Sequence, residues 1–167
     1  VVGGSALPQS MIETFEDDHD VACIHAWGMT EMSPLGTVGH MTNRLLSDND
    51  ADIMRYKVKQ GRVLYGVDMK IINDEGSTLP QDGNAFGELC VKGPWVTSGY
   101  FETDSSSSFD SEGWFRTGDV ATIDDYGFME IVDRAKDVIK SCLLTTSSAA
   151  GECLGEDSRG TRISQNT

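Results

Sequence analysis

The sequence predicts an α/β protein in which part of a parallel α/β layer is followed by an antiparallel β module. Three observations predict this fold class. The N-terminal residues alternate between apolar runs and a helical repeat, which is typical of a strand–helix–strand unit. From about residue 60 onward, β-forming runs alternate with turn residues. With 167 residues, of which 38% are hydrophobic, the chain can bury a core of useful size.

The N-terminal unit is predicted from short-range periodicity. Val1–Val2 would end a first strand, and Leu7, Met11 and Phe15 recur every four residues, which predicts a short amphipathic helix. Residues 21–24 then form a continuous apolar run of the kind that is buried on both faces of a parallel sheet. The unit would therefore place two parallel strands in one layer.

A polar connecting segment is expected from about residue 41 to residue 60, with some helix around residues 50–57. The antiparallel β module is expected over residues 60–132, because the β-rich runs there are separated by turns rich in Asp, Asn and Gly. The predicted strands cover residues 63–72, 87–92, 120–123 and 128–132.

The charge of the chain restricts its partners. There are 27 acidic and 13 basic side chains, a formal net charge of −14, and no cluster of Lys and Arg. Such a surface repels phosphate backbones and anionic lipids, so we expect no nucleic-acid partner. No apolar run approaches the roughly 18 residues that cross a bilayer, so we expect no transmembrane segment. Cys23, Cys90, Cys142 and Cys153 form no C-x-x-C pair, which favours reduced core thiols and a cytoplasmic location.

Three short motifs carry the functional signal. They are a Trp-Gly-Met-Thr-Glu turn after the first buried strand, a Gly-Trp-Phe-Arg-Thr-Gly-Asp string, and a charged string that begins Asp-Arg. Each alone has a structural explanation, as a capped strand end, a turn or a solvated charged surface. Their order along one chain favours a functional explanation. The motifs span residues 27–31, 113–119 and 133–140.

In this order the motifs resemble the adenylate-forming family, which comprises acyl-CoA synthetases, the adenylation domains of peptide synthetases and beetle-type luciferases. The resemblance covers residues 1 to about 141. Within the family, the residues around Trp27 and Trp114 look most like those of the medium-chain fatty acyl-CoA synthetases, a branch that includes methylmercaptopropionate-CoA ligases. The matching segments are Gly3-Gly4-Ser5-Ala6 for the adenine-site loop, residues 27–31 for the aromatic-Gly-x-Thr-Glu motif, Gly87-Glu88-Leu89 with Gly99-Tyr100 for the G-E-L…G-Y stretch, residues 114–119 for W-x-x-T-G-D and residues 133–140 for the hinge motif.

The resemblance implies a fragment of the adenylate-forming N-terminal domain, truncated at both ends. It implies an enzyme, an ATP-dependent fatty acid (medium- or long-chain) CoA ligase, that activates a carboxylate as an acyl-adenylate and transfers it to coenzyme A. Its ligands would be ATP or AMP, Mg²⁺, coenzyme A and a small-molecule carboxylate. Two alternatives stay open: another adenylating enzyme, such as a methylmercaptopropionate-CoA ligase or an amino-acid adenylation domain, and a non-enzymatic acidic binding domain.

The resemblance also implies catalytic roles, because two anions must meet in this reaction and their charge must be neutralised. Thr30 would donate its hydroxyl to the α-phosphate. Glu31 would be the magnesium ligand, since one carboxylate together with phosphate oxygens commonly holds this ion. Lys136 would mark the point about which the family's C-terminal domain rotates.

The remaining site residues would bind the nucleotide. Trp27 would offer a flat face to adenine, and Gly28 would leave room where the nucleotide approaches the main chain. Asp119 would accept hydrogen bonds from the ribose diol, and Arg134 would reach the ribose or the phosphate. His25, in the apolar strand, is expected to be a hydrogen-bonded core residue rather than a base. The adenine-site loop contributes Gly4, Ser5 and Ala6.

The chain departs from the family pattern at both ends. It begins after the family's Thr/Ser/Gly-rich phosphate loop, and its residues after Ser141 match neither the family's glycine-containing stretch nor its C-terminal domain with a catalytic lysine. We therefore expect little or no ligase activity from this chain alone. The hypothesis is a fragment with a frameshift or mis-spliced end near Ser141, which sequencing of the locus and its transcript would test.

The sequence thus divides into four parts: residues 1–59, a partial α/β nucleotide-binding layer with the connecting segment; residues 60–132, the antiparallel β module; residues 133–141, the hinge motif; and residues 142–167, a tail expected to be disordered because it is rich in Ser, Thr and Gly without periodicity.

Overall fold

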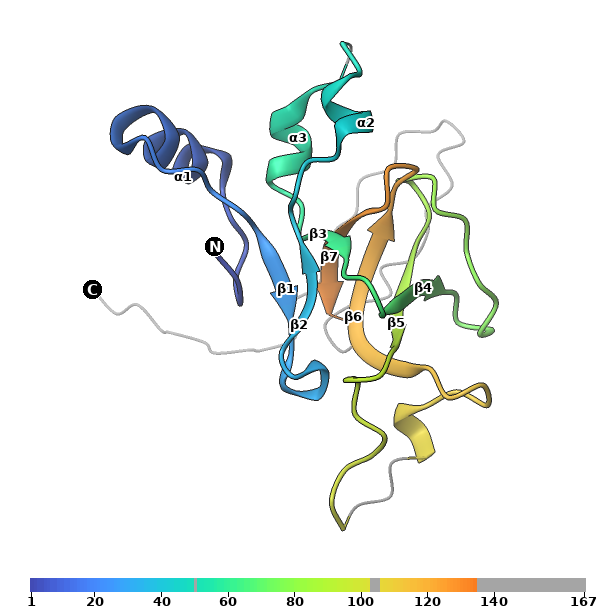
Figure 1. The fold of residues 1–167 in the computed structure, drawn as a ribbon. Helices are drawn as coiled ribbons and strands as arrows, with labels where there is room; N and C mark the ends of the chain where they lie inside the picture. Colours follow the sequence, from blue (N-terminus) through green and yellow to red (C-terminus); the bar gives the residue numbers. More distant parts are fainter. Residues whose placement is uncertain (50, 103–105, 135–167) are drawn as a thin grey trace, which may run out of the picture.

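The computed structural model describes residues 1–49, 51–102 and 106–134. Its main feature is a seven-stranded sheet in the order β1-β2-β3-β7-β6-β5-β4, in which all neighbouring strands are antiparallel (Figure 1). The strands are β1 (Ala26–Gly28), β2 (Leu35–Val38), β3 (Gly61–Val63), β4 (Asp68–Ile72), β5 (Phe86–Lys92), β6 (Phe115–Ile123) and β7 (Phe128–Arg134). The helical segments are α1 (Gln9–Glu13), η1 (Thr14–Asp18), η2 (Thr30–Met32), α2 (Asn43–Leu46), α3 (Ile53–Lys57) and η3 (Ser106–Ser108).

The parallel part of the predicted layer is present as a single bridge. Val2 pairs with His25 in parallel orientation: the Val2 N–H donates to the Ile24 carbonyl at 2.8 Å, and the Ala26 N–H donates to the Val2 carbonyl at 2.8 Å. The chain between the two sides of this bridge contains α1 and η1, so the predicted helical connection is present, while the predicted pair of parallel strands is reduced to this one bridge. From Ala26 onward, β1 pairs with β2 in the antiparallel sheet.

The prediction of a buried strand over residues 21–24 is wrong. Val21 and Ala22 are exposed, and the strand begins only at Ala26. The reason lies in the end of the preceding helical segment: Asp20 adopts a left-handed φ of 53°, and the Val21 N–H donates to the Phe15 carbonyl. The backbone at residues 20 and 21 still belongs to the end of the helical segment. The strand therefore begins at Ala26 rather than at Val21.

The predicted apolar face of the N-terminal helix is also wrong in part. Ile12 is completely buried and Leu7 nearly so, but Met11 and Phe15 are 43% and 40% exposed. The α-helical hydrogen-bond pattern ends at Glu13 and continues as a π-helical turn. Because a π-helical turn contains more residues than an α-helical turn, the four-residue repeat leaves the buried face at Phe15. Met11 lies in the α-helical part, where Ile12 occupies the buried face in its place.

The connecting segment contains two capped helices, which confirms the helix expected around residues 50–57. Thr42 caps α2, its hydroxyl accepting from the Leu45 N–H at 3.2 Å, and Asp52 caps α3, its carboxylate accepting from the Met54 N–H at 3.1 Å. Such caps satisfy N–H groups that have no partner within the helix. Both helices lie at one margin of the sheet in Figure 1.

The predicted β-rich runs are strands of the sheet, and the first of them divides into β3 and β4. The pairing of β7 with β3 on one side and with β6 on the other determines the topology. Because of this arrangement, the hairpin β1-β2 and the group β4-β5-β6 belong to one continuous sheet. The division at residue 59 into two units stays a prediction. The hinge residues beyond Arg134 and the tail lie outside the described residues.

The hydrophobic core cluster includes Trp27, Met32, Leu89 and Phe115. Cys90 is completely buried in β5, and this burial, together with the nearby charge of Glu88, raises the pKa of its thiol to about 11. The thiol is therefore neutral and unreactive near neutral pH. Cys90 and the half-buried Cys23 are both free, and Cys142 and Cys153 lie outside the described residues. The described helices are too short and too polar to form a membrane span.

A buried ion pair ties the connecting segment to the turn between β6 and β7. The Lys59 ammonium lies 2.7 Å from Asp124 Oδ2, and both residues are buried. The other oxygen of Asp124 accepts from the N–H groups of Tyr126 and Phe128 at 3.0 and 2.9 Å, which closes the turn. Removal of one charge would leave its partner buried without compensation.

We therefore expect Lys59→Met to lower the free energy of unfolding by about 3 kcal/mol, because the Asp124 carboxylate would stay buried without its cation. Urea denaturation followed by circular dichroism measures the difference. The matched control is Arg55→Met, an exposed cation four residues away, which should change the stability by less than about 0.5 kcal/mol. Equal effects of the two substitutions would contradict the structural role of the ion pair.

Candidate functional site

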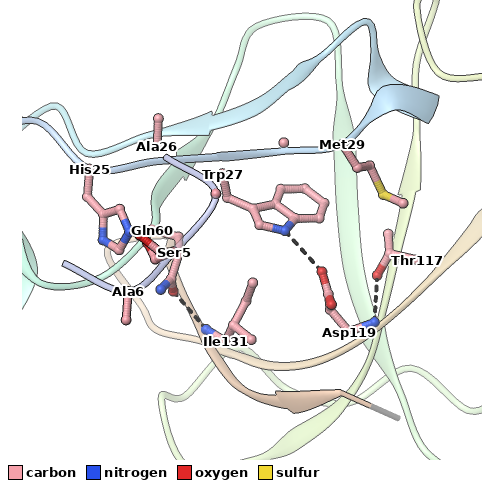
Figure 2. A pocket seen from close by; sticks show the side chains of 12 residues that line it. Ser5, Ala6, His25, Ala26, Trp27, Met29, Gln60, Thr117, Asp119 and Ile131 are labelled. Atoms are coloured by element: carbon pink, nitrogen blue, oxygen red, sulfur yellow. Dashed lines mark hydrogen bonds between the residues drawn. The ribbon is translucent and has the colours of Figure 1, made fainter. Parts of the chain in front are cut away.

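A cavity of about 300 Å³ opens between the N-terminal loop, β1 and the adjoining parts of β6 and β7 (Figure 2). This volume lies at the lower end of the range for small-molecule sites, roughly 300 to 1,000 Å³. The cavity contains most of the predicted nucleotide-binding positions. Its lining residues are Gly4, Ser5, Ala6, His25, Ala26, Trp27, Gly28, Met29, Gln60, Thr117, Asp119 and Ile131.

The predicted adenine-site loop forms one wall of the cavity and is held there by His25. This side chain is 1% exposed, and its ring nitrogens contact two main-chain carbonyls: Nδ1 lies 2.9 Å from the oxygen of Val58, and Nε2 lies 3.1 Å from the oxygen of Ser5. A neutral imidazole has one N–H and serves one of these carbonyls at a time. His25 is thus the hydrogen-bonded core residue that the sequence predicted, and it also lines the cavity.

Trp27 lies in the wall of the cavity with its ring buried. The side chain is 7% exposed, and it packs so closely on Gly36 that a Cβ there would lie 2.6 Å from the Trp27 ring atom Cζ3. The indole Nε1 donates to Asp119 Oδ2 at 3.0 Å, as Figure 2 shows. Two residues that the sequence predicted for one site are therefore in direct contact.

Asp119 reaches the cavity because of a bulge in β6. Between the pairs Glu88–Val120 and Cys90–Arg116, the β5 strand has one residue while β6 has three, residues 117–119. The extra residues bend the strand and change the direction of the side chains that follow, as bulges commonly do. Asp119 itself is 8% exposed.

The Thr-Gly pair before Asp119 stabilises this bulge. Gly118 has a φ of 75°, a conformation that other residues rarely adopt, and a Cβ there would meet nothing within 4 Å, so the backbone conformation alone explains the glycine. The Thr117 hydroxyl donates to the Leu89 carbonyl at 2.9 Å and accepts from the Asp119 N–H at 3.1 Å. The motif thus aims a carboxylate at the cavity.

Gly28 lines the cavity, but a further constraint requires glycine there. A Cβ at this position would lie 1.9 Å from the carbonyl oxygen of Pro34. The same carbonyl accepts from the Met29 N–H at 2.7 Å and so closes the connection between β1 and β2. The close approach of two backbone segments accounts for the glycine, whether or not a nucleotide approaches it.

Thr30 and Glu31, the predicted catalytic pair, follow the cavity-lining residue Met29 directly in the chain but are not themselves among the lining residues. They begin the short helix η2. The Glu31 side chain is half-buried and its Oε1 accepts from the Tyr100 hydroxyl at 2.8 Å, while its main-chain carbonyl accepts from the Thr97 N–H at 2.7 Å. The hydrogen bond to Glu31 raises the pKa of Tyr100.

Within the described part of the chain, no group of three or more His, Cys, Asp or Glu side chains could hold a metal ion. A Mg²⁺ ion that is held mainly by phosphate oxygens and water needs only one or two protein carboxylates. Glu31 fits this mode of binding as a single carboxylate, and it does not form a complete metal site by itself.

Arg134 ends β7 and pairs with Asp119 in the register of β6 and β7, so its backbone lies beside the site. Its side chain and the whole of Lys136 lie outside the part of the structure that is described. The β6–β7 pairing therefore supports the predicted position of Arg134 beside the site.

Several cavity residues were not predicted for the site. The Gln60 carboxamide accepts from the Ile131 N–H at 2.8 Å, and its main-chain carbonyl accepts from the Thr37 hydroxyl at 2.6 Å. Both contacts depend on the pairing of β3 with β2 and β7, which no local pattern indicates. Thr117 could have been found, because it stands two residues before Asp119 in a recognised motif.

The fold and the cavity agree with the class of protein that a family comparison identifies. Residues 1–101 match the family of AMP-binding enzymes, and the chain belongs to this family. It is 52% identical over 141 residues to a medium-chain-fatty-acid–CoA ligase of Ectopseudomonas oleovorans, and 50% identical over 145 residues to a 3-methylmercaptopropionyl-CoA ligase of Ruegeria pomeroyi. Each alignment covers 84% of this chain and 26% of the relative. The chain thus spans about a quarter of the length of these relatives.

Solved structures show the same relationship. The chain resembles ATP-bound MatB from Rhodopseudomonas palustris, with a TM-score of 0.66 and 28% identity over 82% of this chain and 25% of that one. It also resembles the O-succinylbenzoate coenzyme A synthetase of Bacillus subtilis in complex with AMP, with a TM-score of 0.66 and 29% identity over 82% of this chain and 26% of that one. The predicted membership of the adenylate-forming family is confirmed.

The contact at Gly28 predicts an effect on stability that needs no ligand. Gly28→Ala should lower the free energy of unfolding by about 1 to 3 kcal/mol, because the new methyl group collides with the Pro34 carbonyl and main-chain atoms must move. Thermal and urea unfolding without nucleotide measure the loss. Gly3→Ala is a milder comparison, since its new methyl group would lie 3.2 Å from the Ala26 carbonyl oxygen, and it should lose less stability than Gly28→Ala. A Gly28→Ala variant as stable as the parent chain would show that the connection has room for a side chain.

Proposed function

We propose that this chain forms part of the nucleotide site of an ATP-dependent fatty acid–CoA ligase that acts on medium- or long-chain carboxylates. Family membership and the names of the relatives support the reaction type. The observation that carries the proposal is the convergence of six predicted nucleotide-binding positions, which come from three separate segments, on one cavity. These positions are Gly4, Ser5, Ala6, Trp27, Gly28 and Asp119.

In the proposed reaction, a carboxylate oxygen attacks the α-phosphate of ATP and pyrophosphate leaves, which produces an acyl-adenylate. The thiol of coenzyme A then attacks the acyl carbon and AMP leaves. Asp119 holds the ribose by accepting hydrogen bonds from its hydroxyls, Thr30 donates to an α-phosphate oxygen, and Arg134 supplies positive charge near them. These contacts orient the reactants and reduce the repulsion between two anions.

Glu31 is the proposed ligand of a Mg²⁺ ion, whose charge would neutralise phosphate oxygens. The hydrogen bond from Tyr100 to Oε1 supports this role, because it holds the carboxylate in one orientation. The Thr97 contact to the Glu31 main chain fixes the residue further. The position of Glu31 just beyond the cavity lining suits a metal that lies toward the phosphates rather than beside the base.

Lys136 is proposed as the pivot of a domain rotation, within a hinge motif over residues 133–141 that follows the β module. The proposed domain division keeps residues 1–59 as the nucleotide-binding layer and residues 60–132 as the module. A cytoplasmic location suits the free thiols of Cys23 and Cys90, since a reducing compartment keeps such thiols free.

A 3-methylmercaptopropionyl-CoA ligase is the second candidate, because a relative of that name is 50% identical to this chain, almost as similar as the medium-chain-fatty-acid–CoA ligase. Both are acid–CoA ligases, so the nucleotide site does not distinguish them. A substrate screen on a full-length parent with octanoate and 3-methylmercaptopropionate would do so.

The nucleotide site predicts AMP binding that depends on Asp119. Asp119→Ala should weaken AMP binding at least about tenfold, because a buried charged acceptor of hydrogen bonds is lost. Isothermal titration calorimetry with AMP measures the affinity. Asp125→Ala, which removes an exposed carboxylate from the β6–β7 turn, is the control and should leave the affinity unchanged. Identical AMP affinities of the parent chain and Asp119→Ala would remove Asp119 from the site.

We expect negligible catalysis from these 167 residues tested alone, because the aligned region spans 26% of the medium-chain-fatty-acid–CoA ligase. Loss of several charge-stabilising groups costs orders of magnitude in rate. Pyrophosphate release with octanoate, ATP and Mg²⁺ tests this expectation, with a complete synthetase as positive control. Comparable turnover of the two proteins would overturn it.

A further inference from the structure

The hydrogen bond from Trp27 to Asp119 lies within the wall of the cavity. Nε1 and Oδ2 are 3.0 Å apart, and the two side chains are 7% and 8% exposed. The indole nitrogen can only donate, so the contact determines which carboxylate oxygen faces the ring. A hydrogen bond to an ionised acceptor in buried surroundings is stronger than one between neutral groups in water.

The donor in this contact is itself held by packing. The ring of Trp27 lies against Gly36, where no Cβ would fit, and against the core, which includes the completely buried Met32. The backbone of the acceptor is held from the other side, because the Thr117 hydroxyl accepts from the Asp119 N–H. The indole therefore cannot turn to follow the carboxylate, and the carboxylate must orient itself to the indole.

We propose that Trp27 is a positioning residue that acts through Asp119: its N–H holds the carboxylate in the orientation that accepts hydrogen bonds from the ribose hydroxyls of a bound nucleotide. This inference rests on the proposed function, in which Asp119 binds the ribose. The proposal distinguishes two functions of the Trp27 side chain, stacking through the ring and hydrogen bonding through the N–H. A stacking face interacts with the base, whereas an N–H that acts through Asp119 affects only ligands that have ribose hydroxyls.

A measurement without ligand tests the contact itself. The chain has three tryptophans, so its amide–proton NMR spectrum contains three indole signals, which Trp→Phe variants assign. Asp119→Ala should shift the Trp27 indole N–H signal and accelerate its exchange with solvent, and it should leave the signals of Trp95 and Trp114 in place. An unchanged Trp27 signal would overturn the proposal.

A ligand comparison tests the role of the contact. Trp27→Phe keeps an aromatic ring but removes the N–H, so we expect AMP affinity to fall about tenfold while the affinity for 2′,3′-dideoxy-AMP changes less than about twofold. In the Asp119→Ala background, Trp27→Phe should cause no further loss of AMP affinity. Equal losses for both nucleotides, or a full further loss in that background, would overturn the proposal in favour of stacking.

Two variants control for folding. Replacement of Trp27 by β-(3-benzothienyl)alanine keeps the size of the ring and substitutes sulfur for the N–H, so it should reproduce the ribose-dependent loss without a cavity in the core. Trp95→Phe removes another indole hydrogen bond, the one to the Leu35 carbonyl at 3.2 Å, at a position that does not line the cavity, and it should leave both affinities unchanged.

The outcomes separate this inference from the function on which it rests. If AMP binds and Asp119→Ala has no effect, the ribose role of Asp119 and the proposed site are wrong. If Asp119→Ala weakens AMP and the benzothienyl variant does not, the site stands and the positioning role of Trp27 is wrong. If AMP does not bind the parent chain, the proposed function and the ribose role of Asp119 are both wrong. The NMR experiment then still decides whether the Trp27 indole holds the Asp119 carboxylate.

Discussion

A hydrogen bond between Trp27 and Asp119 joins segments that are 92 residues apart in the sequence, and the candidate site depends on it. It can form only because β7 pairs with both β3 and β6, which brings the N-terminal hairpin and the later strands into one sheet. The ring is fixed by core packing and the carboxylate by a bulge that the Thr117 side chain closes. Packing, strand pairing and polar contact thus stabilise the same arrangement, and each would be weaker without the other two.

Two kinds of constraint meet around the cavity. Some residues are required by the backbone: Gly28 approaches the Pro34 carbonyl, and Gly118 has a positive φ. Others are chemical groups that a ligand can reach, of which Asp119 is the charged one among the lining residues. A motif that contains both kinds therefore determines shape as well as chemistry, because the carboxylate is aimed correctly only if the turn before it has the required conformation.

The helical turn that carries Thr30 and Glu31 is tied to a different part of the molecule. Glu31 contacts Thr97 and Tyr100, in the loop after β5, while Met32 of the same turn donates its N–H to the carbonyl of the cavity-lining Met29 at 2.9 Å. The predicted base- and ribose-binding residues and the predicted phosphate and metal residues are thus held by separate sets of hydrogen bonds, although only Met29 lies between Gly28 and Thr30 in the chain.

The sequence by itself determined the family, the strands of the β module, a helix within residues 50–57 and six predicted site positions that line one cavity, because these are carried by short motifs and short-range patterns. It placed a strand at residues 21–24 and an apolar face through Met11 and Phe15 incorrectly. A left-handed residue and a π-helical turn leave no mark in apolar periodicity, and Ile12 rather than Met11 takes the buried position in α1. Only the tertiary structure decided that β7 lies between β3 and β6, that Gln60 lines the cavity, and that the indole of Trp27 faces a carboxylate. These features depend on contacts between residues far apart in the chain, and such contacts are selected by packing and strand register rather than by any local pattern.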